Sequence, residues 1–195
     1  MTSAGLLGSP AYSVYRLFFC GCYCRILGER QLFYSKAQIF LHWLSAAIIL
    51  WALISGFYVA LFDTSLVLKE TVDFFNVSIT AAFIPFFVVR VFLSFFRGKQ
   101  TDRTLAQWTA FWVHKVIYLV TGIVLATGVM MMDRAINLFG LFLIPAPAES
   151  AGIVAVFKKI HDVSCVVLAV LVVLHIGAVI RHEVSGHRIL RRMLW

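Results

Sequence analysis

The sequence predicts an all-α integral membrane protein, a four-helix bundle with both termini in the cytoplasm. Of its 195 residues, 62% are hydrophobic and only 13% are charged, whereas soluble proteins average about 25% charged residues. The chain also contains four apolar runs, each long enough to cross the roughly 30 Å hydrocarbon core of a bilayer. Basic residues gather in the segments on one side of these runs.

The first run, residues 39–62, contains no Asp, Glu, Lys or Arg, and each of the other three runs contains a single charged residue. The other runs are 74–96 with Arg90, 111–132 with Lys115, and 160–180 with Asp162. We therefore expect a transmembrane domain over residues 36–195, preceded by a cytoplasmic or interfacial extension over residues 1–35. Lys115 is expected to contact lipid headgroups. The run Ile136–Pro147 is too short to span and ends in prolines, so it predicts an interfacial element.

Orientation follows from the positive-inside rule, which places Lys- and Arg-rich loops in the cytoplasm. The basic residues of the predicted cytoplasmic side are Arg16, Arg25, Arg30, Lys36, Arg97, Lys99, Arg103, Arg181, Arg188, Arg191 and Arg192. The other side holds only Lys69, Arg134, Lys158 and Lys159. This bias, together with anionic lipid headgroups, accounts for the formal charge of +8. No basic surface remains for nucleic acid.

The N-terminal extension carries Cys20, Cys22 and Cys24 at alternate positions. A zinc site would need a fourth ligand and usually two residues between paired cysteines, so reduced cysteines near the bilayer are the favoured interpretation. Lipidation of a thiol is an alternative.

The histidines fall near the ends of the spans. His42 lies about one turn inside the cytoplasmic end of the first helix, and His175 lies about one turn from the cytoplasmic end of the antiparallel fourth helix. His161 precedes His175 by 14 residues, which is roughly 21 Å along one face. The same interval separates His42 from Gly56 and His114 from Gly128, where a missing side chain admits a flat group.

Two histidines at one depth on facing helices indicate a site for a metal or cofactor. Zinc would require three or four ligands. Haem iron requires only two axial imidazoles, because the porphyrin supplies the other nitrogens. The sequence lacks C-x-x-C-H, which excludes covalent attachment. A b-type haem between His42 and His175 is the best physical account.

These residues resemble the bacterial cytochrome b561 family of four-helix membrane cytochromes. The stretches that carry the resemblance are SKAQIFLHWLSAAIILWALISG, VHKVIYLVTGIVLATGVMM, the pair His161 and His175, and RHEVSGHRILRRM. The resemblance extends from about Ser35 to the C-terminus.

The resemblance implies two b haems, one in each leaflet, each held by two histidines. The inner pair corresponds to His42 and His175. The outer pair corresponds to His161 and a histidine near the start of helix two, where this sequence has Asn76 instead. Since an amide is a poor haem ligand, the outer haem is in doubt, and one firmly bound haem is expected.

The resemblance further implies an oxidoreductase of the bacterial inner membrane that passes electrons to ubiquinone or a related quinone. The donor would be superoxide or a periplasmic redox protein. His114 and His182 could bond a quinone carbonyl or a haem propionate, or simply face water. Arg90 could pair with a propionate, or extend to the headgroups.

Two other classes remain open from the sequence. A small transporter would show polar residues or broken helices at mid-membrane depth, and only Pro85 interrupts a span here. A haem-binding anchor subunit of a larger dehydrogenase or hydrogenase uses similar histidine-bearing helices, and a soluble partner that co-purifies would distinguish it.

Overall fold

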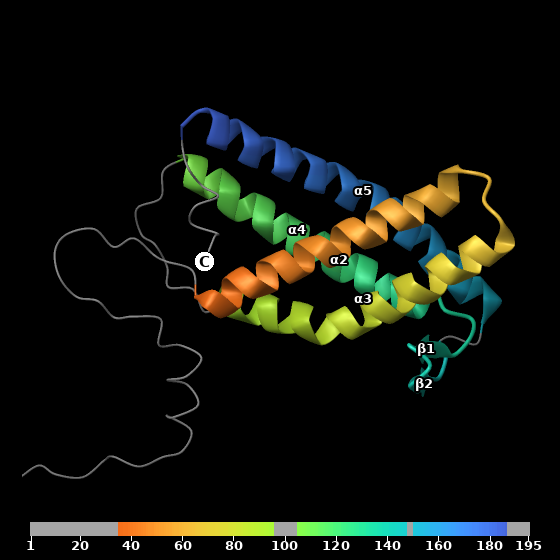
Figure 1. Cartoon of the computed structure of the whole chain (residues 1–195). Helices are drawn as coiled ribbons and strands as arrows, with labels where there is room; N and C mark the ends of the chain where they lie inside the picture. Colours follow the sequence, from red (N-terminus) through yellow and green to blue (C-terminus); the bar gives the residue numbers. More distant parts are fainter. Residues whose placement is uncertain (1–34, 96–104, 148–149, 187–195) are drawn as a thin grey trace, which may run out of the picture.

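The computed structural model describes residues 35–95, 105–147 and 150–186 (Figure 1). Within these ranges, four helices are long and apolar enough to cross a membrane, which confirms the predicted helical membrane bundle. The helices are α2 (Lys36–Leu61), α3 (Leu66–Phe95), α4 (Leu105–Met130) and α5 (Ala151–Val184). The cysteines of the extension, His187 and the basic residues 97–103 lie outside the described residues.

The helices extend beyond the apolar runs that predict them. α3 begins at Leu66 instead of residue 74, and α5 begins at Ala151 instead of residue 160. The physical reason is that an apolar run marks only the part of a helix within hydrocarbon, whereas the helix itself continues into the polar interface until its backbone is capped. Pro85 lies inside α3, which is continuous across it.

α2 begins at a capping box. The Ser35 hydroxyl accepts a hydrogen bond from the Gln38 amide at 3.3 Å, and the Gln38 side-chain oxygen accepts one from the Ser35 amide at 3.2 Å. Two backbone donors at the helix start are thereby satisfied. This fixed start sets the axial position of His42, six residues into the helix.

The bundle is built from two helix pairs. α2 packs mainly along α3, and α4 packs mainly along α5, while contacts between α3 and α4 join the pairs (Figure 1). Among the described residues, the helices bury small polar side chains, namely Ser45, Ser55, Ser78, Thr121 and Thr127. Close approach through small residues is the usual mode of helix association in membranes. Because His42 lies on α2 and His175 lies on α5, the two histidines belong to different helix pairs.

A β-hairpin lies at the end of the bundle opposite His42 (Figure 1). β1 (Ile136–Leu138) pairs antiparallel with β2 (Phe142–Ile144). The buried Ser78 hydroxyl of α3 donates to the Asn137 carbonyl at 3.0 Å and accepts from the Phe139 amide at 3.3 Å. The sequence predicts only an interfacial element here. The structure shows a hairpin fixed to α3, with all of β2 exposed.

Candidate functional site

Four residues, one from each helix, gather at the end of the bundle where α2 begins. We call them the inner cluster: His42 of α2, Arg90 of α3, His114 of α4 and His175 of α5. Each lies five to nine residues from the helix end on this side, which corresponds to roughly 8–14 Å along the axis. The antiparallel directions of the helices thus bring four sequence-predicted residues to one level.

The cluster is held by short polar and aromatic contacts. An Arg90 guanidinium nitrogen, Nη2, lies 2.8 Å from His42 Nδ1. The rings of His114 and His175 meet edge to face, with 5.0 Å between their centroids. All four side chains are half-buried.

Arg90 points into the bundle in this structure. Its guanidinium carbon lies 5.2 Å from the centre of the Tyr118 ring. The cation therefore contacts an imidazole and an aromatic face. A cation over an aromatic ring is stabilised by the quadrupole of the ring. The sequence left open whether Arg90 faces the cofactor space or the headgroups. In this structure the guanidinium contacts His42 and the Tyr118 ring.

The hydrogen bonds assign protons to two imidazoles. Guanidinium can only donate, so His42 Nδ1 accepts, and the proton of the neutral ring is on Nε2. His114 Nδ1 lies 2.6 Å from the Ala110 carbonyl, which can only accept, so this Nδ1 carries the proton and Nε2 carries the lone pair. These tautomers are inferred from the hydrogen-bond network.

A second set of residues, the outer cluster, surrounds His161 and consists of His161, Thr127, Gly128 and Cys165. His161 Nδ1 lies 3.1 Å from the Val124 carbonyl, to which it donates, and 3.3 Å from the Thr127 hydroxyl oxygen. His161 Nε2 lies 3.4 Å from Cys165 Sγ. The imidazole is therefore fixed against α4, with its second nitrogen turned to the thiol one helical turn away.

Gly128 lies directly beneath this imidazole. A Cβ added at Gly128 would lie 3.2 Å from His161 Cε1, closer than ordinary van der Waals contact. The sequence predicts that the glycine admits a flat group, and the flat group beside it in this structure is the imidazole of His161 itself.

Asn76 makes its contacts with α2. The Ser55 hydroxyl donates to the Asn76 side-chain oxygen at 2.9 Å, and the Asn76 nitrogen lies 3.8 Å from where a Cβ of Gly56 would stand. Asn76 and His161 both lie ten residues from the start of their helices, at corresponding depths. Asn76 is nevertheless hydrogen-bonded to α2, and His161 to α4.

Sequence reasoning missed several contacts of these clusters. Tyr118 of α4 lies beside Arg90, and Cys165 of α5 contacts His161. Both could have been suspected from spacing, because Tyr118 follows His114 by four residues and Cys165 follows His161 by four. His182 lies in the last turn of α5, is exposed, and stands seven residues beyond His175.

The inner cluster fits a haem held by two imidazoles, because it offers imidazoles on opposite helix pairs together with a cation. Within the described residues, no group of three or more His, Cys, Asp or Glu side chains is arranged to hold a metal ion, and haem iron needs only two protein ligands. Thr121 follows His114 by seven residues and precedes Gly128 by seven. Its buried hydroxyl has no hydrogen-bond partner in the described part of the chain. The outer cluster offers one imidazole and a thiol, and Asn76 at the corresponding depth offers only an amide, so these residues do not fit a second bis-imidazole site.

The approach of His161 to Gly128 predicts a position-specific effect of adding a methyl group. Gly128→Ala should lower the free energy of unfolding by about 1–3 kcal/mol, because the imidazole must move and its bonds to Val124 and Thr127 weaken. Gly177→Ala is the matched control, since nothing lies within 4 Å of a Cβ at that position. Thermal unfolding in detergent measures both variants. Equal midpoints for the two would contradict the proposed contact.

Comparison with known proteins gives one family match. The family model described as prokaryotic cytochrome b561 matches residues 34–195, which include all four helices and both clusters. No curated protein matches the chain.

Proposed function

The chain belongs to the prokaryotic cytochrome b561 family, and from this membership we propose that it passes electrons from a donor to the quinone pool. The family implies a membrane b-type cytochrome in electron transfer. The observation that carries the proposal is the meeting of His42, Arg90, His114 and His175, one from each helix, at a single level of the bundle.

His42 and His175 are the proposed axial ligands of the inner haem. They stand on antiparallel helices of different helix pairs, so a cofactor held by both would join the two pairs. A bound haem supplies one-electron redox chemistry in an apolar interior. The protein's part is to hold two neutral imidazoles there and to exclude water from them.

Arg90 has a proposed double role. An imidazole binds a metal through an unprotonated nitrogen, so ligation through His42 Nε2 requires the ring proton to move to Nδ1. Arg90 would then have to release Nδ1, because guanidinium cannot accept a hydrogen bond. The released cation would pair with a haem propionate, which satisfies a charge that is costly within a membrane.

His114 and His182 are the proposed contacts for the quinone, in its oxidised or reduced form, or for a haem propionate on the same side. The proton on His114 Nδ1 is held by the Ala110 carbonyl, so Nε2 acts as an acceptor in the neutral ring. An acceptor suits the hydroxyl of a quinol better than a quinone carbonyl or an ionised propionate. His182 is exposed and lies beyond the inner cluster, so we propose that its ring N–H donates to a quinone carbonyl or to a propionate.

The outer cluster is proposed to hold no firmly bound haem. His161 would be the only imidazole available, and Asn76 is engaged with Ser55. In the proposed topology this cluster faces the outside of a bacterial inner membrane, both termini are cytoplasmic, and ubiquinone or a related quinone is the acceptor. The proposed donor is superoxide or a periplasmic redox protein.

Removal of either proposed axial ligand should abolish the inner haem. His42→Ala and His175→Ala should each reduce bound haem to near zero, because the iron would keep one imidazole ligand instead of the two that make it low-spin and hold it. His182→Ala, on the same helix as His175, is the control and should retain its haem while quinone reduction slows. Haem content by pyridine haemochrome assay, with the visible spectrum, measures this. A wild-type spectrum in both ligand variants would refute the pairing.

Restoring an imidazole at position 76 tests the outer site. Asn76→His should raise haem content towards two per chain and add a second low-spin component to the redox titration, since it supplies the partner that His161 lacks. Asn76→Gln is the control without an imidazole and should leave haem content unchanged. Adding His161→Ala to Asn76→His should remove the gain. Two low-spin haems in the unmodified protein would mean that another residue is the ligand.

A further inference from the structure

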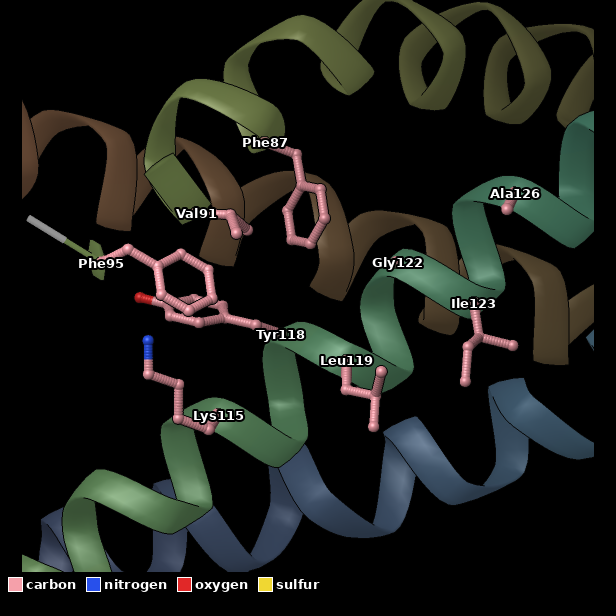
Figure 2. Close-up of a pocket in the computed structure, with 9 residues that line it drawn as sticks. All are labelled: Phe87, Val91, Phe95, Lys115, Tyr118, Leu119, Gly122, Ile123 and Ala126. Atoms are coloured by element: carbon pink, nitrogen blue, oxygen red, sulfur yellow. The ribbon is translucent and has the colours of Figure 1, made fainter. Parts of the chain in front are cut away.

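A cavity of about 400 Å³ lies between α3 and α4 (Figure 2). Phe87, Val91 and Phe95 of α3 form one wall, and Tyr118 and Leu119 of α4 form part of the other. Phe95 and Leu119 are 69% and 64% exposed, so the cavity opens on the outer surface of the bundle. We call it the α3–α4 groove. Its size is within the range of small-molecule sites, and its walls are almost entirely apolar.

One cation stands at the end of this groove. Lys115 Nζ donates to the Ser94 hydroxyl at 3.2 Å and lies 3.9 Å from the centre of the Phe95 ring (Figure 2). The Phe111 ring lies 5.6 Å away. An ammonium group has three donors, and the contacts observed for Lys115 provide one oxygen acceptor and two aromatic faces. Within the part of the chain that the structure describes, its charge is therefore only partly satisfied.

In α3 and α4, the two helices that line the groove, the acidic residues lie far from Lys115. α4 contains no Asp or Glu, and the acidic residues of α3 are Glu70 and Asp73. α5, which packs along α4 but does not line the groove, carries Asp162 and Glu183. Glu70 precedes Ser94 by 24 residues, which places it roughly 36 Å away along the helix. Arg90, behind the Tyr118 ring, adds a second positive charge near the groove. Two cations, Lys115 and Arg90, therefore lie beside the walls of this end of the groove.

The side chain of Lys115 is long enough to reach the membrane interface from its position in α4. The spanning part of α4 begins at Trp108, and Lys115 is seven residues further on, or roughly 10 Å. Trp108 and Trp112 are both exposed, as expected for aromatic residues at headgroup level. A lysine side chain at such a depth extends towards the interface, where the phosphate groups of the lipids lie.

We propose that the α3–α4 groove binds an anionic phospholipid, with one acyl chain along the apolar wall and its phosphate at the Lys115 ammonium. The positive charge distinguishes this occupant from a quinone, whose neutral head does not require a cation. The acyl chain accounts for a groove that continues from Lys115 past Leu119. This inference requires only that the bundle is embedded in a membrane, so it stands or fails separately from the proposed electron transfer.

The test compares lipid-dependent stability in nanodiscs of the full chain. Wild-type protein should unfold at a higher temperature in phosphatidylcholine containing phosphatidylglycerol than in phosphatidylcholine alone. Native mass spectrometry should detect a retained phosphatidylglycerol. Lys115→Gln should weaken this retention roughly tenfold, the effect of losing about 1.4 kcal/mol of charge-assisted contact. Lys115→Arg, which keeps the charge, should retain the lipid.

Two further variants separate a specific site from general electrostatics. Lys158→Gln removes an exposed lysine from the opposite end of the bundle and should leave lipid retention unchanged. Ala126→Leu fills the apolar wall and should weaken retention while Lys115 remains. Equal effects of Lys115→Gln and Lys158→Gln would overturn the proposal. So would equal protection by phosphatidylcholine alone, or retention of a quinone in place of phosphatidylglycerol.

Discussion

The contact between Arg90 and His42 is the interaction on which the inner half of the bundle depends. A guanidinium group and an imidazole inside a membrane span each need a polar partner, since an unsatisfied polar group in hydrocarbon is costly. At 2.8 Å they satisfy one another across α2 and α3, while His114 and His175 meet across α4 and α5. Each helix pair therefore brings its own polar contact to the same level. The proposed haem would exchange these contacts for iron ligation and a propionate pair.

The outer half satisfies its polar groups in a different way. Asn76 is bonded to Ser55 within the first helix pair, and His161 is bonded to Val124 and Thr127 within the second. Gly128 allows the imidazole to lie against the helix backbone. The two ends thus differ in their polar content. The inner end has imidazoles on both helix pairs, and the outer end has an imidazole on only one.

The sequence predicts the parts of this structure that depend on hydrophobic length and helical period. The four spans follow from apolar runs, and the common level of His42 and His175 follows from their distances to the helix ends. Partner choice does not follow from these patterns. The periodicity places Arg90 within α3 but does not show that it meets His42, nor that the ring beside Gly128 is that of His161. The hairpin at 136–144 depends on a tertiary contact with Ser78, which local sequence does not encode.

The most direct measurement of the central claim is the haem content and visible spectrum of the purified wild-type protein, before and after reduction by dithionite. Two imidazoles at one level of an apolar bundle predict a non-covalent, low-spin b haem, extractable with acid–acetone, at about one per chain. A colourless preparation from haem-replete cells, or a haem that stays covalently attached after extraction, would contradict the account.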